Sequence, residues 1–456
     1  MAYQSIDPLT RQLIKVFPNH TDVEVESALT QAHTLYKSEW SQPKNIDERL
    51  ELLQRLTKLM IEHQEKIART ITMEMGKRIV ESRNEVINSI EIIQYCVKHA
   101  AELLKPIAYP SKLGTGWVEH HPIGIILAIE SWSFPIYQLI RVIAPAIAVG
   151  NPVVAKHASN VPQCAQLVED LLHEAQAPAG TYTNLYVSYD QIAAIIADQR
   201  VQGVTLTGSE DTGSIVAELA GSKLKKSTME LGGNSVFIVT DDTDIVAAAH
   251  TAATECLFNA GQACIAAKRF IVHEKLADQF IQIVKDDFAQ VVMSDPMDEK
   301  TTLAPLSSFK VLNILSDQLY TAIDYGAKIL CNNPLGEYNF FAPTLITDIS
   351  RDNPAYFEEF FGPVAQLYVV KNDEEAITLA NDSNFGLGGT VFCKDIERAK
   401  NLASRIETGM VFINRFGDSV AELPFGGVKC SGYGRELSDL GIKEFVNHKF
   451  VVLAQD

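Results

Sequence analysis

The sequence has few cysteines and none of the close spacings that hold metal ions. Its seven cysteines are widely separated, and neither C-x-x-C nor H-E-x-x-H occurs. Because such spacings build structural zinc sites and the zinc sites of many proteases, we expect no metal site. An odd number of distant cysteines also favours a reducing compartment, in which most thiols stay free.

Long apolar runs and an excess of basic residues are absent too. The apolar runs 123–129 and 142–150 are far shorter than the roughly 20 residues that cross a bilayer. The first fifteen residues lack the pattern of a signal peptide, so we expect a cytoplasmic protein without a membrane partner. A net charge of −18 argues against a nucleic-acid partner, which would require basic patches.

The pattern of apolar residues predicts an α/β fold. Residues 22–103 have apolar residues at helical spacing, and residues 106–122 mix turn residues with alternation that suggests a hairpin. Strand-like and helix-like runs alternate from 123 to about 240, and this alternation restarts after 233 and continues to about 430. Two doubly wound, Rossmann-like domains are therefore expected. No Pro- or Ser-rich linker separates them, so they should share a broad interface where a ligand can bind.

One cysteine has unusually small neighbours. Cys264, in the stretch "FNAGQACIAAKRF" (258–270), lies among Gly261, Ala263 and Ala266. A structural cysteine usually packs among larger apolar side chains, whereas this thiol has room for a reactant. From the residues alone, a cysteine at a helix end in a packed core remains the alternative.

Two segments could contact phosphate or ribose. In "VTLTGSEDTGSIVAELA" (204–220), Gly208 and Gly213 flank the turn between a strand and a helix, and Ser209 adds a hydroxyl. Glycine permits close approach, and the helix N-terminus offers free N–H groups. The alternative is an ordinary βα turn, because the segment matches neither G-x-G-x-x-G nor a P-loop. Lys156 ends a predicted strand, where α/β sheets bind ligands, although it could be a surface lysine.

Five segments, in order, resemble motifs of the NAD(P)-dependent aldehyde dehydrogenase superfamily, over nearly the whole chain. Two more, "FPIYQLIR" (134–141) and "KHASN" (156–160), are similar to the shorter succinate-semialdehyde dehydrogenases of bacteria. The five motifs are "MELGGNSVFIV" (229–239), "FNAGQACIAAKR" (258–269), "EEFFGPV" (358–364), "NDSNFGLGGTVF" (381–392) and "PFGGVKCSGYGRE" (424–436).

The resemblance implies a division of the chain and an assembly. Residues 1–103 and 123–232 would form a cofactor-binding domain, and residues 233–430 a catalytic domain. Residues 104–122 and 443–456 would form a small β oligomerisation arm. Because such arms pair between subunits and cover an exposed sheet edge, a homodimer or homotetramer is expected.

The resemblance also implies the chemistry. Cys264 matches the nucleophile that attacks the aldehyde, forms a thiohemiacetal, loses hydride to NAD or NADP and leaves a thioester. Glu230 matches the general base that activates water to release the acid. Its apolar neighbours Met229 and Leu231 favour a raised pKa, which suits a base near neutral pH.

Eight residues would bind the cofactor. Glu359 would bond the nicotinamide ribose, with a solvated carboxylate as the alternative, and Phe361 would pack beside the nicotinamide. Ser159 stands where NAD-selective relatives have a glutamate that repels a 2′-phosphate, so NADP should be accepted and NAD use remains open. The full set is Trp132, Lys156, Ser159, Gly208, Ser209, Gly213, Glu359 and Phe361.

Ser133 departs from the resemblance most sharply. The family has an asparagine at this position of "SWSFP" (131–135), and its amide helps to stabilise the oxyanion. The serine side chain is shorter and would need a water to reach the oxyanion, although the backbone N–H of Cys264 should still donate. Since one lost donor costs about 3 kcal/mol, we expect a slower enzyme or a shifted substrate pose.

The residues for the substrate's far end are also altered. Ser419 is kept, but the position of the relatives' arginine holds Glu422. Arg141 could bind a distal carboxylate and share a helix face with Phe134, although an arginine tied to an acidic neighbour is the alternative. Tyr137 is a further hydrogen-bonding candidate.

We therefore expect oxidation of succinate semialdehyde to succinate, with a broad-specificity aliphatic or aromatic aldehyde dehydrogenase as the alternative. A CoA-acylating relative is less favoured because Glu230 is present. A non-catalytic relative with a binding role is less favoured because Cys264 is present as well.

Overall fold

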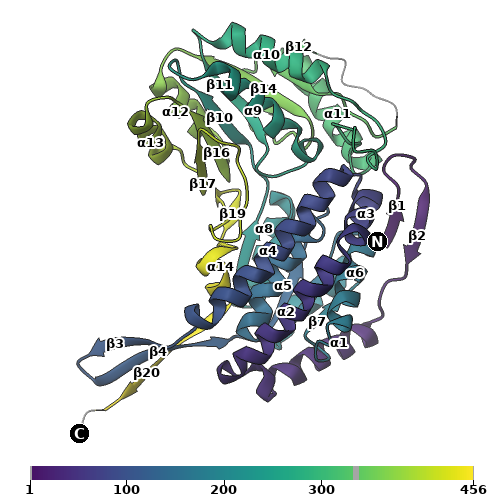
Figure 1. Cartoon of the computed structure of the whole chain (residues 1–456), viewed down its shortest axis with the longest axis vertical. Helices are drawn as coiled ribbons and strands as arrows, with labels where there is room; N and C mark the ends of the chain where they lie inside the picture. The colour runs from purple at the N-terminus through teal and green to yellow at the C-terminus, as the bar shows by residue number, and fades with distance from the viewer. Residues whose placement is uncertain (1–2, 332–337, 455–456) are drawn as a thin grey trace.

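The computed structural model describes residues 3–331 and 338–454 and contains two large β-sheets flanked by helices (Figure 1). All neighbouring strands in these sheets are parallel except β19 beside β9 and β12 beside β13. The first sheet has the order β19-β9-β8-β5-β6-β7, and the second has the order β12-β13-β14-β11-β10-β16-β17. The predicted α/β class with two Rossmann-like units is confirmed.

The strands of the first sheet are β5 (Ile125–Ile129), β6 (Val153–Lys156), β7 (Tyr182–Asn184), β8 (Val201–Thr207), β9 (Lys226–Glu230) and β19 (Gly432–Tyr433). Those of the second are β10 (Ser235–Val239), β11 (Ala267–His273), β12 (Lys328–Cys331), β13 (Thr344–Thr347), β14 (Val364–Val370), β16 (Gly388–Phe392) and β17 (Met410–Ile413). A small sheet pairs β15 (Phe385–Gly386) with β18 (Val428–Lys429).

The first sheet is buried on both faces. Ile126 and Ala128 of β5 enter the core with α2–α6, whereas Ile125, Leu127 and Ile129 enter the core on the opposite face. This alternation explains why the whole strand is apolar, as parallel strands between two helical layers usually are. The helices here are α1 (Asp22–Tyr36), α2 (Ile46–Glu62), α3 (Gln64–Met75), α4 (Ile79–Leu103), α5 (Tyr137–Val149), α6 (Pro162–Glu174), α7 (Tyr189–Ala197) and α8 (Glu210–Ser222).

The predicted helical region 22–103 corresponds to α1–α4, with short 3-10 turns at Glu39–Ser41 and Pro43–Asn45. Among the described residues, none of the helices combines the length and the apolar character needed to cross a membrane. The remaining helices are α9 (Ile245–Leu257), α10 (Ala277–Ala289), α11 (Phe309–Asp324), α12 (Asp373–Asn381), α13 (Ile396–Arg405), α14 (Ser438–Glu444) and the 3-10 turns Phe258–Gly261 and Pro354–Tyr356.

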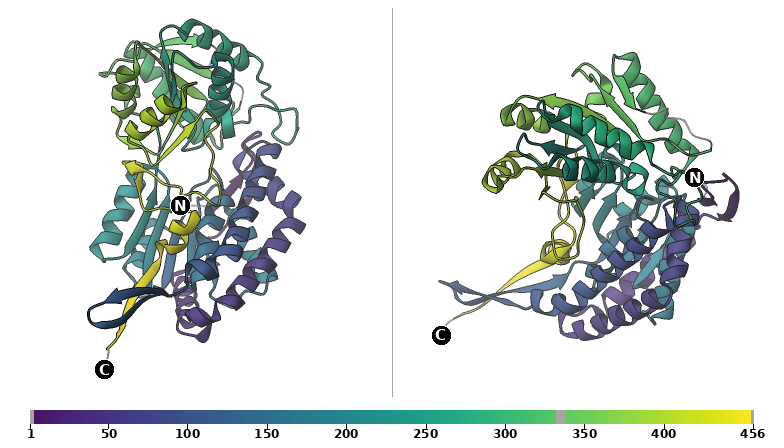
Figure 2. Two further views of the ribbon diagram at one scale, coloured as in Figure 1. Left: turned by 60° about the vertical axis from the view of Figure 1, so that its left-hand side comes forward. Right: turned by 45° about the horizontal axis from the view of Figure 1, so that its top comes forward.

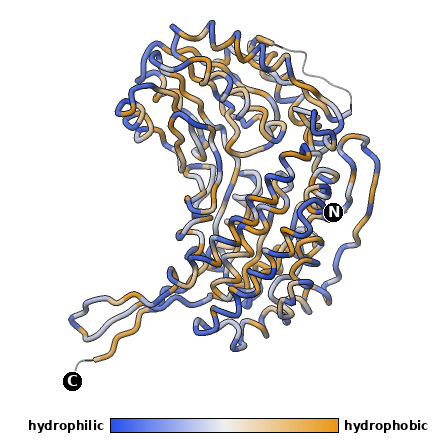
Figure 3. Tube along the Cα trace, viewed as in Figure 1, coloured by the Kyte–Doolittle hydropathy of each residue, from blue (hydrophilic) through white to orange (hydrophobic). Residues whose placement is uncertain are grey.

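A three-stranded arm projects from the body (Figures 1 and 2). The predicted hairpin is present as β3 (Ile107–Ser111) and β4 (Gly114–Pro122), and β20 (Val446–Leu453) pairs with β4 on its other side. Figure 3 shows hydrophobic residues along the outer part of β20, where Phe450 and Leu453 are exposed. Residues 455 and 456 of the predicted arm lie outside the described residues.

An N-terminal hairpin was not predicted from the sequence. It consists of β1 (Tyr3–Ile6) and β2 (Leu13–Phe17), and four of the five residues of β2 are exposed, so β2 has no alternation of buried and exposed positions. The Tyr3 hydroxyl donates to the Val187 carbonyl at 2.9 Å. The Gln4 N–H donates to the Ser159 carbonyl, also at 2.9 Å.

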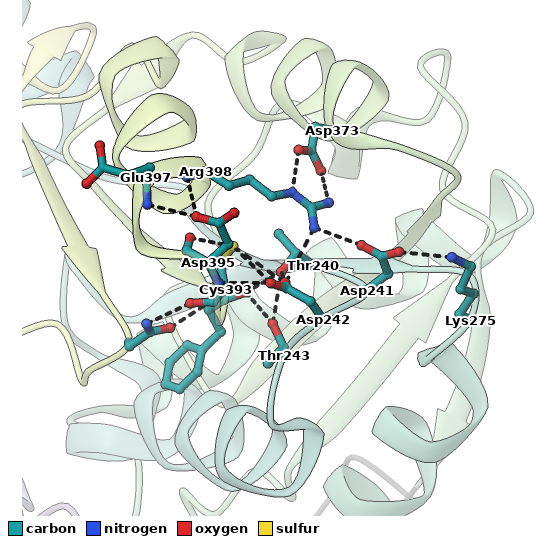
Figure 4. Close-up of polar contacts among 12 residues, drawn as sticks. Thr240, Asp241, Asp242, Thr243, Lys275, Asp373, Cys393, Asp395, Glu397 and Arg398 are labelled. Carbon is teal, nitrogen blue, oxygen red and sulfur yellow. Dashed lines mark hydrogen bonds and ion pairs between the residues drawn. The ribbon is translucent and has the colours of Figure 1, made fainter.

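A group of charged side chains closes the far end of the second sheet, where β10 and β16 end (Figure 4). We call Arg398, Asp241, Asp242 and Asp373 the Arg398 network. Arg398 donates from Nε to Asp373 at 2.7 Å and from Nη1 to Asp241 at 2.8 Å. The side chain of Arg398 is 28% exposed, so the network ties α12, α13 and β10 together at a wet surface.

Candidate active site

The carboxyl end of the first sheet meets the amino end of the second. Glu230 ends β9, β10 begins at Ser235, and Cys264 lies just before β11. At Gly233, a Cβ atom would lie 2.3 Å from the carbonyl oxygen of Cys264. The segment after Glu230 and the cysteine loop are therefore in direct contact, which places the two predicted catalytic residues at one junction.

Backbone contacts hold the cysteine loop and leave the thiol partly exposed. Asn259 and Ala260 have left-handed φ angles of 53° and 54°, which L-residues adopt only when the surroundings hold them there. The buried ammonium of Lys268 donates to the carbonyls of Gly261 at 2.6 Å and Gly362 at 2.8 Å. Lys268 thus fastens the loop, a role that its position after the cysteine did not reveal.

The Cys264 thiol is held in its protonated form. Burial raises its pKa to about 12, Arg141 opposes the rise, and Glu359 and Glu230 add to it. Because only the thiolate is a strong nucleophile, attack on a substrate requires a group that takes the thiol proton. Cys264 is only partly buried as a residue, so water can take that proton.

Glu230 is a buried acid without a fixed partner. It is 3% exposed, and neither carboxylate oxygen has a hydrogen-bond partner among the described residues. Burial raises its pKa well above the usual value, Glu436 raises it further, and Arg141 lowers it. A Cβ at Gly426 would lie 2.7 Å from Oε1 of Glu230, so the glycine makes room for the carboxylate. These properties suit a general base that works near neutral pH.

One buried arginine serves three buried carboxylates here. Arg141 forms an ion pair with Glu436, with side chains 4% and 8% exposed, and donates from Nη2 to the Thr207 hydroxyl at 3.3 Å. Glu130 and Glu230 also act on its charge. We call Arg141, Glu130, Glu230 and Glu436 the Arg141 network. The structure therefore favours the alternative in which Arg141 is tied to an acidic neighbour, and sequence reasoning did not identify Glu130 or Glu436.

The Ser133 hydroxyl belongs to a closed ring of hydrogen bonds. It accepts from Nε2 of Gln138 at 3.1 Å and lies 3.2 Å from the hydroxyl of Ser131, which in turn donates to Oε1 of Gln138 at 3.1 Å. With these roles filled, the proton of Ser133 points to Ser131. Ser133 would have to leave this ring to donate to an oxyanion.

The predicted substrate residues Tyr137 and Ser419 meet. Their hydroxyl oxygens are 2.5 Å apart, and the guanidinium of Arg141 lies 5.6 Å from the centre of the Tyr137 ring. Phe134 contacts Phe258 with ring centres 5.8 Å apart. A polar pair thus adjoins an apolar wall, whereas Glu422 is exposed.

The residues predicted to hold the nicotinamide end fit a ribose and a flat ring. Oε1 of Glu359 is buried without a hydrogen-bond partner in the part of the chain that the structure describes, so it can accept from a ribose hydroxyl. Burial raises the pKa of Glu359 to about 8, opposed by Lys268. Trp132 and Phe361 meet edge to face with ring centres 5.5 Å apart. A Cβ at Gly232 would lie 2.6 Å from Oε2 of Glu359.

The residues predicted to hold the adenosine end also fit. Lys156 ends β6, and no carboxylate among the described residues forms an ion pair with it, while burial lowers its pKa to about 8. Gly208 and Ser209 join β8 to α8 as predicted, with the Ser209 hydroxyl capping α8. A Cβ at Gly208 would meet only Leu206, at 3.4 Å, which leaves that turn open. Gly213 is buried within α8, and its Cβ would lie 2.5 Å from Leu231, so this glycine serves the packing of α8 and its contact with a diphosphate stays a prediction.

Comparison with known proteins leads to the same family as the sequence motifs. The model of the aldehyde dehydrogenase family matches residues 1–451. A relative from Deinococcus radiodurans, named succinate-semialdehyde dehydrogenase (NADP(+)), is 44% identical over 451 residues, which are 98% of this chain and 94% of the relative. A relative from Mycobacterium tuberculosis, named succinate-semialdehyde dehydrogenase (NADP(+)) 1, is 39% identical and is covered over 100% of both chains.

A solved structure agrees in fold over the whole chain. The succinic semialdehyde dehydrogenase from Streptococcus pyogenes, in complex with NADP+ as the cofactor, matches with a TM-score of 0.98 and 44% identity over 100% of both chains. Sequence motifs, site geometry and full-length similarity thus agree, and the chain belongs to the aldehyde dehydrogenase family.

Proposed function

We propose that the protein oxidises succinate semialdehyde to succinate with NADP+ as the hydride acceptor. The observation that carries the proposal is the junction of the two sheets, where the partly buried Cys264 and the buried, unpartnered carboxylate of Glu230 come from segments that are in direct contact. The relatives named above support the choice of substrate and cofactor. One aldehyde, one water and one NADP+ give one carboxylate, one NADPH and protons.

Cys264 and Glu230 divide the work. The thiol gives its proton to water, and the sulfur bonds to the aldehyde carbon while the C=O electron pair moves onto oxygen, which gives a thiohemiacetal whose oxyanion accepts from the backbone N–H of Cys264. Loss of hydride turns this adduct into a thioester. Glu230 then takes a proton from water, the water oxygen bonds to the thioester carbon, and the C–S electron pair returns to Cys264.

The cofactor would bind along the carboxyl end of the first sheet. Bound NADP+ supplies the hydride acceptor. Glu359 would hold the nicotinamide ribose, Gly208 and Ser209 would meet the diphosphate, and Lys156 would pair with the 2′-phosphate. The serine at position 159 leaves space without negative charge beside that phosphate, so NADP should bind more tightly than NAD.

The distal carboxylate of the substrate would be recognised by two hydroxyls. Tyr137 and Ser419 are hydrogen-bonded to each other at 2.5 Å, so one of them has a free proton to donate, and a carboxylate that replaced their mutual bond could accept from both. Arg141 would act indirectly, because its charge is engaged with Glu436. Replacing Ser419 with alanine should raise KM for succinate semialdehyde more than KM for an uncharged aldehyde of equal length.

The test of the proposed function separates hydride transfer from hydrolysis. Cys264→Ala should abolish oxidation of the aldehyde while leaving NADP+ binding intact, since only the nucleophile is lost. Glu230→Gln should keep a burst of NADPH and lower the steady-state rate by about 10²-fold or more. Wild-type turnover in Cys264→Ala, or an unchanged steady state in Glu230→Gln, would reject the mechanism. A panel of aldehydes, with and without CoA, checks the substrate and the hydrolytic fate.

Ser133→Asn tests the oxyanion donor. Since the ring with Ser131 and Gln138 occupies the serine proton, an asparagine amide would add a donor that the wild type lacks. We expect kcat to rise, by up to about 10²-fold, with little change in NADP+ affinity. The measurement is steady-state kcat at saturating NADP+, with Ser131→Ala as the control for a broken ring. A ratio of variant to wild type at or below one contradicts this role.

We further propose a cytoplasmic homodimer or homotetramer built through the arm. Ile107 and Tyr109 of β3, with Leu113 and Phe450, are exposed apolar side chains on a projecting sheet, which a second copy would cover. The division into the predicted cofactor-binding and catalytic domains remains a proposal as well. A sedimentation profile with only a 50 kDa species at micromolar concentration would reject the assembly.

A further inference from the structure

Glu130 is a carboxylate at the active-site end of the first sheet that the proposed mechanism does not use. It follows β5 directly, and the register pairs Ile129 with Leu206 and Thr207 with Glu230. Extending the first pairing by one residue places Glu130 beside Thr207. Glu130, Thr207 and Glu230 therefore form a row across three neighbouring parallel strands. Side chains in one row of a sheet project to the same face, so Glu130 and Glu230 flank Thr207.

The surroundings of Glu130 contain too little positive charge to balance its ionised carboxylate. It is 2% exposed, and neither of its oxygens has a hydrogen-bond partner in the described part of the chain. Burial raises the pKa of Glu130 well above the usual value, Glu436 raises it further, and Arg141 and a long, weak contact with the Thr207 hydroxyl oppose both. Arg141 is already paired with Glu436, and Arg435 lowers the pKa of Glu230 but does not act on Glu130. Ionisation of Glu130 therefore opposes ionisation of Glu230.

Lys156 accepts from the Glu130 N–H through its carbonyl, but it pairs with Ile129 in the register, so its side chain projects to the opposite face of the sheet. The Tyr182 hydroxyl on β7 is buried, and burial raises its pKa well above the usual value. His157, whose Nδ1 lies 3.2 Å from the Glu130 carbonyl, has a pKa lowered to about 4 by burial. Beyond Glu436, Arg435 and Glu444 line a pocket between α5 and α14 together with Arg141, through which water can exchange protons with the network.

We propose that Glu130 is a positioning residue of the hydrolytic step, which competes with Glu230 and Glu436 for the charge of Arg141 and so raises the pH at which Glu230 can accept the proton of water. Glu130 does not touch the reacting atoms. It acts through Arg141 and through its own charge, and Thr207 separates it from Glu230 in the row. This inference rests on the proposed function of Glu230 as the base.

The test is the pH profile of thioester hydrolysis in Glu130→Gln. The amide keeps the shape of the side chain and removes its charge, so the pKa of Glu230 should fall. We expect the rising limb of the steady-state rate after the burst to move to lower pH by about one unit. The KM for the aldehyde should change by less than about twofold, because the variant leaves Tyr137 and Ser419 in place. The proposal would be overturned if the rising limb of the pH profile stayed within about 0.2 pH unit of its position in the wild type.

Two variants separate a charge effect from a structural effect. Glu130→Asp keeps the charge and should return the limb to within about half a unit of the wild type. Glu74→Gln alters another buried carboxylate, which accepts from the N–H groups of Gln163 and Cys164 at the start of α6. It should lower stability and leave the limb in place, and a shift as large as that of Glu130→Gln would overturn the proposal.

The outcome can be distinguished from a failure of the proposed function. If Glu230→Gln hydrolyses the thioester at the wild-type rate, Glu230 is not the base, whatever Glu130→Gln does. If Glu230→Gln is slow and the limb of Glu130→Gln is unmoved, only the role of Glu130 is wrong. Should Glu130→Gln fail to fold, Glu130→Leu removes the same charge without burying a polar group, and the same shift is required.

Discussion

The Arg141 network and the Arg398 network each combine one arginine with three carboxylates, yet they differ in every electrostatic property. Arg141 and Glu436 are 4% and 8% exposed, whereas Arg398 and Asp241 are 28% and 27% exposed. Burial raises the pKa of Glu230 well above its usual value. Hydrogen bonds from Lys275 and Arg398 instead lower that of Asp241.

The difference shows that access to water decides what such a network does. Arg398 donates to Asp373, Asp241 and Asp242, so these hydrogen bonds hold three elements in place. Arg141 pairs with one carboxylate and leaves two others without hydrogen-bond partners among the described residues. A satisfied network stabilises a fold, whereas an under-satisfied buried network keeps protons available near neutral pH.

The largest difference in stability between the two networks should appear when the arginine of each network is replaced. Arg141→Met leaves Glu436 buried without its cation, which costs about 3–5 kcal/mol of unfolding free energy. Arg398→Met leaves solvated carboxylates and should cost no more than about 1 kcal/mol. Denaturant unfolding at pH 7 measures both. The double variant Arg141→Met with Glu436→Gln should recover part of the loss, and equal losses in the two single variants would remove the distinction between the networks.

A smaller pair of effects is expected in the pH dependence of stability, where Glu230 and Asp241 should act with opposite signs. The folded pKa of Glu230 lies above its unfolded value near 4.3, so stability falls as pH rises through that window, and Glu230→Gln should remove this fall. The variant should match the wild type near pH 4 and exceed it at pH 8, by about 1.4 kcal/mol for each unit of raised pKa.

Asp241 should behave in the reverse manner. Its folded pKa is lowered, so its stabilisation is present above the unfolded value near 3.9 and is lost as pH falls below it. Asp241→Asn should therefore be less stable than the wild type at pH 7 and equal to it at strongly acidic pH. Unfolding midpoints measured across pH 3–8 for both variants check the two signs, and parallel curves for the two variants would contradict the comparison.

Salt should give the smallest effect. Raising the ionic strength from about 0.1 to 1 M shortens the screening length from about 10 Å to about 3 Å. The loss in Arg398→Met should then shrink by a few tenths of a kcal/mol, because its pairs face water. The loss in Arg141→Met should stay the same. A salt-dependent loss in Arg141→Met would mean that its ion pair is hydrated.

The sequence predicts most of the architecture because the relevant signals are local. The apolar strand at 125–129 and the turn residues at 106–122 predict a parallel core strand and a hairpin without knowledge of distant contacts. The role of Cys264 is predicted by its motif as a whole, because its small neighbours alone also fit a cysteine at a helix end in a packed core. The N-terminal hairpin was missed because β2 is exposed on four of five residues and has no pattern to detect.

The electrostatics of the site could not be predicted, because its partners are far apart in the sequence. Arg141 and Glu436 are separated by 295 positions, and the row that joins Glu130 to Glu230 exists only through the register of three strands. Ser133 is an intermediate case. The asparagine it replaces could be named from the motif, but its engagement with Gln138 required the rotamers of both side chains.

The contacts of the N-terminal hairpin also constrain how the protein is made. The hydroxyl of Tyr3 bonds to a carbonyl 184 residues later in the chain, and Gln4 bonds to Ser159 beside the proposed cofactor site. A ribosome that adds 5–20 residues per second needs roughly 10–40 s to reach Val187. Strand β1 is therefore synthesised early but cannot form these contacts until well over a third of the polypeptide has been translated.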